Sequence, residues 1–215
     1  MVTFPLVSPA GFGVAAVEWG PRDIVARAKN PFTLHDLVQV YDGQMWQGVL
    51  TLYALDAATG RALAAWLTSL SVFGAAGPLG TFRLGDPAHV TPAGAAKSTP
   101  GTPVVSGVGQ TGFALAVEGL PVSTAGYLLA GDYIQLGTGA ASRLHMVLED
   151  AGSDGLGEAT LSIWPSLRAS PVDQDPVVVS GAEGVFAIPA AHRPWRVRAP
   201  RVYEPLSLPV QEHIV

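Results

Sequence analysis

The sequence contains no cysteine, which excludes a disulfide framework and a thiolate metal site. This absence fits synthesis in a reducing cytosol. Charged residues are also scarce, at 13% of the 215 residues, whereas about 25% is usual for globular chains. Since 48% of the residues are hydrophobic, the chain has ample apolar material for a core, and the composition excludes a solvated disordered chain.

Long apolar runs are missing too. The mean hydropathy is +0.33, yet no stretch of about 18 apolar residues occurs, so we expect no membrane insertion. The first residues carry Pro5 and Pro9 and no basic cluster, which argues against a signal peptide. An apolar chain with so few charges instead predicts a surface that is buried against other subunits.

An excess of positive charge is likewise absent. The net charge is −5 and the isoelectric point is about 5.4, so nothing in the charge balance favours nucleic-acid binding. Four arginines near the end of the sequence are separated by prolines, a pattern typical of a solvated strand or an interface rim: Arg193, Arg196, Arg198 and Arg201.

Turn-forming residues are abundant, with 25 glycines and 18 prolines. Both residues break helix interiors, so the composition argues against a helical bundle and predicts short strands joined by turns. The expected fold class is mainly β: a β-sandwich with one flanking helix, plus a small inserted β-barrel or β-sandwich unit.

One amphipathic helix is predicted over residues 57–71. Apolar residues there recur at the helical period, forming a packing face that we expect to lie on a sheet. Asp56 or Thr59 can supply the N-cap oxygen, and Gly74 can end the helix. The residues of the stripe are Leu63, Trp66, Leu67 and Leu70.

The strongest local strand signal is a hairpin. Residues 34–42 and 46–53 read as two strands, and Asp42-Gly43 between them is a typical hairpin turn. Further short strands are expected at 12–19, 81–84, 113–118, 127–136, 143–149, 158–164 and 177–179.

This pattern predicts four segments. Residues 1–85 form a first β-unit, residues 86–112 form a linker or long loop rich in small residues, and residues 113–175 form a second small β-domain. Residues 176–215 return to the first unit as extended segments, because the prolines between 185 and 210 suit edge strands. Deleting residues 113–175 is then expected to leave the first unit folded.

Two glycine-bearing motifs invite a ligand interpretation that their context does not favour. Gly107, Gly109 and Gly112 match the dinucleotide fingerprint, but the apolar segment that follows is too short for the required helix, so we interpret the motif as a turn. The segment from Asp150 to Gly155 resembles a calcium loop, yet Gly152 and Leu161 stand where oxygen ligands are needed, which favours a hairpin loop.

Catalytic signals are also weak. No two of the five histidines have the spacing of a metal pair, and His35 and His145 are expected on exposed strand faces. Acidic residues between 149 and 158 cluster around a turn, where solvation is usual, although a glycosidase pair stays open. We therefore predict no catalytic, cofactor or metal site, and no enzyme.

Several longer sequence segments resemble the distal tail or baseplate-hub proteins of long, non-contractile-tailed bacteriophages. The resemblance covers about two thirds of the chain. The segments that carry it are residues 61–70 (RALAAWLTSL), 80–87 (GTFRLGDP), 130–137 (AGDYIQLG), 155–168 (GLGEATLSIWPSLR) and 201–208 (RVYEPLSL).

The resemblance implies a structural virion protein at the tail tip, made in the cytoplasm of the host bacterium. Such proteins form a homohexameric ring that joins the tail tube to the baseplate hub and the receptor-binding parts. Expected partners are further copies of the chain, the tail tube protein, the tape measure protein and hub proteins. A ring subunit needs two different complementary faces, for which extended terminal segments are suited.

We assign six residues to the expected interface: Trp66, Leu70, Phe73, Trp195, Arg196 and Arg198. Two alternatives stay open. The first is a carbohydrate-binding or glycan-cleaving module of a tail, with Trp164 or Trp195 as platform residues. The second is a tail-tube or terminator ring protein.

Overall fold

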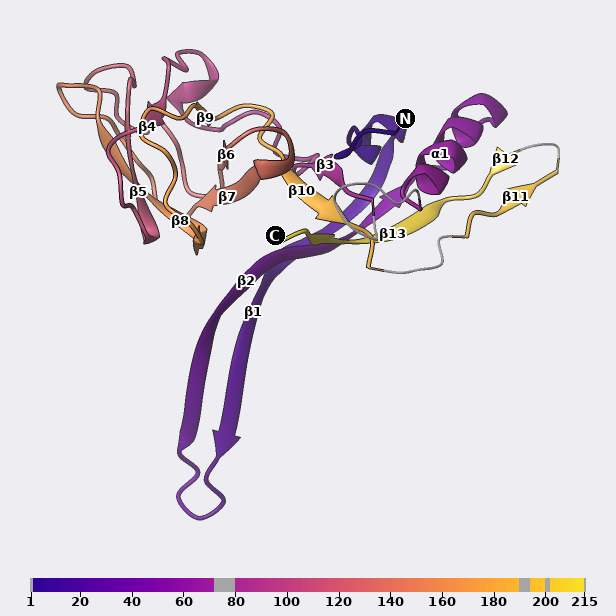
Figure 1. Cartoon of the computed structure of the whole chain (residues 1–215), viewed down its shortest axis with the longest axis horizontal. Helices are drawn as coiled ribbons and strands as arrows, with labels where there is room; N and C mark the ends of the chain where they lie inside the picture. The colour runs from indigo at the N-terminus through magenta and orange to yellow at the C-terminus, as the bar shows by residue number, and fades with distance from the viewer. Residues whose placement is uncertain (1, 72–79, 190–193, 200–201, 215) are drawn as a thin grey trace.

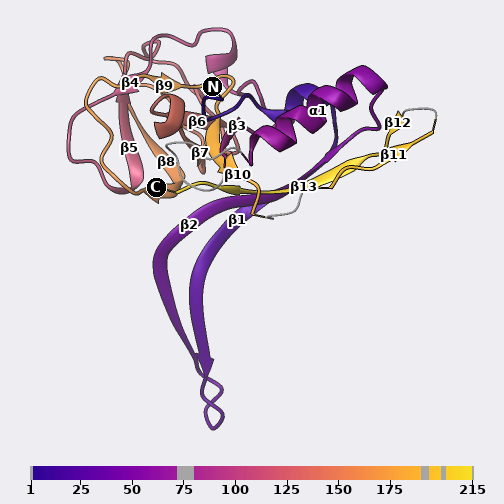
Figure 2. The same cartoon turned by 45° about the vertical axis from the view of Figure 1, so that its right-hand side comes forward.

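The computed structural model of the chain describes residues 2–71, 80–189, 194–199 and 202–214. It is mainly β, as the composition predicts, with one α-helix in the described part. The strands form two units that lie side by side, with a long hairpin projecting away from both (Figures 1 and 2).

The first unit is a five-stranded antiparallel sheet. Its strand order is β1-β2-β13-β10-β3, so segments from both ends of the sequence meet in it. In β13, Leu208 pairs with Leu50 of β2 and Val210 with Gly48. Its strands are β1 (Val14–Lys29), β2 (Asp36–Leu52), β3 (Phe82–Leu84), β10 (Gly184–Ala187) and β13 (Leu206–Glu212).

Helix α1 (Ala57–Ser69) covers part of this sheet and confirms the predicted helix. The Asp56 carboxylate caps it by accepting from the backbone N–H groups of Ala58 and Thr59 at 3.0 and 2.8 Å. Its apolar stripe joins Leu50 and Leu52 of β2 in one core. The expected stop at Gly74 lies outside the described residues.

The second unit is a six-stranded, nearly closed barrel of order β4-β5-β8-β7-β6-β9. Its ends meet where Val104 bridges Pro176 and the Val105 N–H donates to the Asp175 carbonyl at 2.9 Å. It has its own core, which includes Leu115 and Ile163. The strands are β4 (Val104–Val105), β5 (Gly112–Glu118), β6 (Tyr133–Leu136), β7 (Arg143–Val147), β8 (Ala159–Leu167) and β9 (Val177–Val178).

The segment expected to be a linker, 86–112, is instead partly built into the barrel. It contains the 3₁₀ turn η2 (Ala95–Lys97) and strand β4, and both Ala96 and Val105 are buried in the barrel core. The buried Asp132 carboxylate fastens it by accepting from the N–H groups of Ala93 and Gly94. The small residues of 86–112 resemble the composition of a linker. The same residues can pack closely in a folded unit when a side chain such as Asp132 accepts hydrogen bonds from their backbone N–H groups.

The predicted hairpin turn at Asp42-Gly43 is wrong. These residues lie inside β2, which continues from Asp36 to Leu52, and the true partner strand is β1. The chain reverses at residues 30–35 instead. Asp-Gly here marks an irregularity in the strand, where the ladder shifts register opposite Ile24.

The expectation that residues 185–210 form only edge segments is also wrong, because β13 lies between β2 and β10. Pro209 pairs with Val49 on the β2 side. On the other side β10 pairs with β13 only at Gln211 and Glu212, so no described strand lies beside Pro209 there. A short separate hairpin, β11 (Val197–Arg198) with β12 (Val202–Tyr203), precedes β13. The remaining 3₁₀ turns are η1 (Pro9–Phe12) and η3 (Gly139–Ala141).

Candidate functional site

The most distinctive surface is the projecting part of the β1–β2 hairpin, residues 21–43, which we call the arm. Every residue from 21 to 39 is exposed. The arm curves away from the sheet and meets neither the helix nor the barrel along its outer length (Figures 1 and 2). A two-stranded hairpin of this kind is marginally stable in water by itself, which suggests a covering partner.

Local sequence explains the reversal at the arm tip. The Asn30 side-chain oxygen accepts from the N–H groups of Phe32 and Thr33 at 2.9 and 3.2 Å. The Asn30 N–H also donates to the His35 carbonyl, and Leu34 adopts a positive φ of 59°. Asn30-Pro31 is itself a turn signal, and it marks the reversal that was predicted at Asp42-Gly43.

The arm bends where Gly43 lies against Ile24. A Cβ atom at Gly43 would overlap the Ile24 side chain, so only glycine leaves room for that side chain. The register shift between Asp23 and Val25 falls at the same place. Strand irregularities of this kind bend a strand and redirect it.

Apolar side chains are exposed along the arm. Phe32 is 93% exposed, Leu37 70% and Leu34 68%, and Ile24 and Val38 are about half exposed. Monomeric proteins rarely expose large contiguous apolar patches, and such patches mark interaction sites. The arm is therefore one place where the apolar composition of the chain reaches the surface.

The arm differs in charge from the rest of the chain. Residues 21–43 contain three cationic and three anionic side chains, a net charge of 0, so the remainder of the chain carries the whole −5. The charged residues of the arm are Arg22, Asp23, Arg27, Lys29, Asp36 and Asp42.

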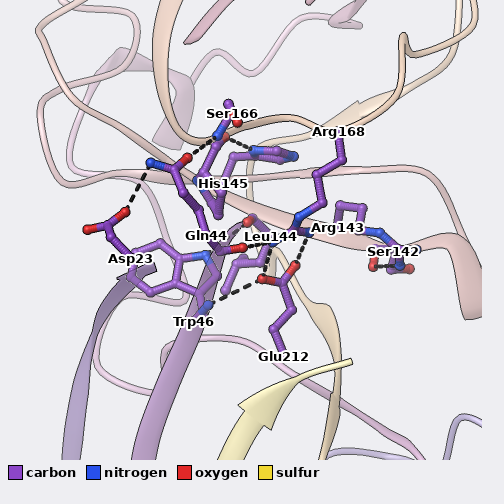
Figure 3. Close-up of polar contacts among 11 residues, drawn as sticks. Asp23, Gln44, Trp46, Ser142, Arg143, Leu144, His145, Ser166, Arg168 and Glu212 are labelled. Atoms are coloured by element: carbon purple, nitrogen blue, oxygen red, sulfur yellow. Dashed lines mark hydrogen bonds and ion pairs between the residues drawn. The ribbon is translucent and has the colours of Figure 1, made fainter. Parts of the chain in front are cut away.

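The base of the arm is fixed by a polar network that joins both units (Figure 3). Gln44 donates to Asp23 across the hairpin at 3.0 Å and accepts from the Ser166 N–H of the barrel at 3.0 Å. Arg168 donates to the Gln44 carbonyl at 2.6 Å and to both carboxylate oxygens of Glu212 at 2.7 Å. The network sets the direction in which the arm leaves the body.

An aromatic cluster lies directly beside this network. Trp46 of β2 packs edge-on against Trp164 of the barrel, with ring centroids 4.5 Å apart, and stacks on Trp19 of β1 at 5.6 Å. Its indole N–H donates to the Leu144 carbonyl at 2.9 Å. Tyr133 packs against Trp46 as well, and burial raises the pKa of Tyr133 well above its usual value. The two units therefore share one core at the junction.

The six residues assigned to an interface fall in different places. Trp66 and Leu70, 7% and 0% exposed, lie in the core of the chain itself, so they offer a neighbour almost no surface. Phe73 lies outside the described residues. Trp195 is 43% exposed beside the β11–β12 hairpin, and the exposed Arg196 and Arg198 share the carboxylate of Glu204. The arm was not among the assigned residues.

The motif interpretations hold where they predicted turns. Gly107, Gly109 and Gly112 all have positive φ and lie in the turn that leads into strand β5, so no helix follows the motif. Asp154 accepts from the N–H groups of Leu156 and Glu158 in the loop between β7 and β8, and these bonds lower its pKa. In the described ranges no three His, Cys, Asp or Glu residues are grouped to hold a metal.

His145 was expected on an exposed strand face, and that expectation is wrong. The ring is 3% exposed, and its Nδ1 donates to the Pro165 carbonyl at 2.8 Å. Burial lowers the pKa of His145 to about 4, so the ring is neutral at physiological pH. The platform residues of the glycan alternative are separated: Trp164 packs on Trp46 at the junction, while Trp195 lies beside the β11–β12 hairpin.

Comparison of the chain with protein-family models and with curated proteins finds no match. Among the described residues, no helix has the length and apolar character needed to span a membrane.

Proposed function

We propose that this protein is a structural subunit of the distal end of a bacteriophage tail, where copies of the chain form a homohexameric ring. The ring joins the tail tube to the baseplate hub and the receptor-binding parts. The proposal rests on the resemblance of its sequence phrases to distal tail proteins, and on a mainly β fold with one flanking helix. It assigns the chain no enzymatic activity.

The observation that carries the proposal is the arm. It exposes Phe32, Leu34 and Leu37 on a hairpin that lies outside the body of the subunit. Burying these side chains against a neighbour would gain roughly 1.5–3 kcal/mol for each one fully covered. The polar network at Gln44 and Arg168 holds the arm at a fixed angle, which a closed ring requires.

A closed ring also needs a second, different face on each subunit. The β11–β12 hairpin is our candidate, because it exposes Trp195, Val197 and Val202 beyond the far end of the helix. Arg196 and Arg198 border these apolar side chains, as at the rim of many interfaces.

Light scattering behind a sizing column tests the proposal. The intact chain should elute with a mass near six times 22.2 kDa. The variant F32S/L34S/L37S should shift to monomers while its circular dichroism spectrum and thermal midpoint are retained, because the substituted side chains are mostly exposed and lie outside both cores.

A matched control removes exposed apolar side chains from the barrel instead. The variant V108S/L156S changes residues that are 80% and 78% exposed and lie in loops of the barrel, and it should keep the oligomer intact. An intact chain that stays monomeric, or an arm variant that assembles like the intact chain, would contradict assembly through the arm. A monomer would also favour the glycan-binding alternative.

A further inference from the structure

A pocket of about 340 Å³ opens on the barrel between β7, β8 and the loop that follows β8. Its volume suits one small organic molecule. Leu136, Leu167 and Pro171 supply apolar walls, while Arg143, His145 and Asp175 supply polar groups. Arg168 of the network at the base of the arm also lines the pocket, but the network contacts use none of the last three side chains.

Arg143 brings a positive charge that forms no ion pair in the described part of the chain. Its Nη1 donates to the carbonyls of Ala140 and Ser142 at 3.4 and 3.1 Å, and its Nε and Nη2 have no partner among the described residues. Burial lowers the pKa of Arg143, the nearby Glu212 carboxylate raises it, and the neighbouring Arg168 lowers it. Because Glu212 already binds Arg168 through both oxygens, an incoming anion would find Arg143 as its free partner.

Two acceptors complete the pocket. The Asp175 carboxylate has no hydrogen-bond or ion-pair partner in the described part of the chain, and it does not pair with Arg143. The buried His145 ring donates through Nδ1, so its Nε2 is an acceptor, and that atom also has no described partner. Unmatched polar groups of both kinds in one pocket indicate a ligand that satisfies them together.

We propose that this pocket binds a small carboxylate that also carries hydroxyl or amino groups. The carboxylate bonds to Arg143 through the free N–H groups of its planar fork. The hydroxyl or amino groups donate to Asp175 and to Nε2 of His145, and the carbon skeleton packs against Leu167 and Pro171. Sugar acids and free amino acids both have this chemistry.

Isothermal titration calorimetry on the full chain tests the proposal with four probes. Glucuronate represents sugar acids and L-leucine represents amino acids, so the probe that binds more tightly identifies which of these two ligand classes the pocket prefers. Glucose and leucinamide match these two probes but lack the carboxylate. We expect glucuronate or leucine to bind with a millimolar or lower Kd, and both probes without a carboxylate to give no heat of binding.

Variants locate the site. R143Q should weaken the binding probe roughly tenfold or more, and R143K should recover part of the affinity because it keeps the charge without the fork. D175N should weaken the same probe and leave the weak binding of acetate unchanged. R83Q is the matched control, since Arg83 pairs with Glu183 outside the pocket. Unchanged thermal midpoints verify folding.

Three results would overturn the proposal. The first is that neither glucuronate nor leucine binds at millimolar concentrations. The second is that R143Q binds the probe as tightly as the intact chain does. The third is that acetate binds as tightly as glucuronate and leucine, because the acceptors Asp175 and His145 would then contribute nothing.

Discussion

Glu212 and Arg168 form a two-point ion pair, with both carboxylate oxygens 2.7 Å from the guanidinium nitrogens. The Glu212 side chain is 1% exposed, so this ion pair stands in for solvent around the carboxylate. The backbone N–H of Trp46 adds a hydrogen bond to the same carboxylate at 3.2 Å. The pair links strand β13 of the sheet to strand β8 of the barrel. It is therefore a joint between the two units.

Removing one side of this pair should be costly. R168M leaves the buried Glu212 carboxylate without its counter-charge, and we expect the free energy of unfolding to fall by about 3 kcal/mol. Urea denaturation measures the change. R83Q breaks the more exposed pair with Glu183 and should cost no more than about 1 kcal/mol. If R168M and R83Q lowered the free energy of unfolding equally, the Arg168–Glu212 pair would contribute no more to stability than the more exposed Arg83–Glu183 pair.

Stability should depend on pH through His145. Its pKa is about 4 in the folded chain and about 6.5 when unfolded, so below pH 6.5 the unfolded state binds more protons. The resulting stability is complete above pH 6.5 and is lost as the pH falls towards 4, by at most about 3 kcal/mol. Burial also lowers the pKa of His213, which acts in the same direction.

Denaturation at several values between pH 7 and pH 5 checks this dependence. H145Q should flatten the slope of stability against pH, whatever it does to the absolute stability. H35Q, in the exposed arm, should leave the slope unchanged. A slope that persists in H145Q at its full size would assign the effect to other groups.

The contact between helix α1 and the β11–β12 hairpin depends on Gly60. A Cβ atom there would overlap the Tyr203 ring, so G60A should destabilise the chain by about 1–3 kcal/mol. Alanine is the better helix former by about 1 kcal/mol, and this gain should appear once the ring is removed. In a Y203A background, G60A should therefore be neutral or stabilising in thermal denaturation. The same loss in both backgrounds would contradict this packing.

Trp195 tests the second face of the proposed ring. W195A should raise the dissociation constant of the oligomer roughly tenfold, because large aromatic side chains dominate interface energies. The stability of the separated subunit should change by less than about 0.5 kcal/mol, since the residue is well exposed. Sedimentation at several concentrations measures the first quantity and urea denaturation the second. Unchanged assembly would exclude this hairpin as an interface.

The barrel and the sheet should not be separable. Replacing residues 93–179 with a short Gly/Ser linker removes Tyr133, Leu144 and Trp164 from around Trp46, so we expect an aggregated or unfolded product. The same linker placed between Gly155 and Leu156, in an exposed loop, should leave the chain folded. A folded, soluble product of the replacement would restore the expectation of an independent first unit.

Local sequence patterns predicted those helices and strands whose formation depends on residues close together in the sequence. The stripe from Leu63 to Leu70 and the Asp56 cap sufficed for α1, and strands β5, β7, β8 and β9 lie close to their predicted ranges. Strand β6 is shorter than the predicted 127–136, and β4 lies in the segment expected to be a linker. The arm was missed because Asp42-Gly43 is a stronger turn signal than Asn30-Pro31, and only the pairing of β1 with β2 decides between them.

Long-range contacts explain the remaining errors. Pro209 suggested an edge segment, but the β10 pairs that flank β13 begin only at Gln211, so the proline disturbs no ladder on that side. The pocket around Arg143 could not be foreseen, because Asp175 reaches it only through closure of the barrel. Neither the place of Pro209 in the sheet nor the approach of Asp175 to Arg143 produces a periodic pattern in the sequence.

The pairing of β2 with β13 has a consequence for the order of synthesis and folding. The β1–β2 hairpin is made first, but its third strand, at residues 206–212, follows more than 150 residues later. The sheet therefore cannot form while the chain is still being translated through the barrel, because contacts so distant in sequence form late. The nascent arm has no rigid base until then, so in the proposed ring its contacts with neighbours would form only once each subunit is almost fully synthesised.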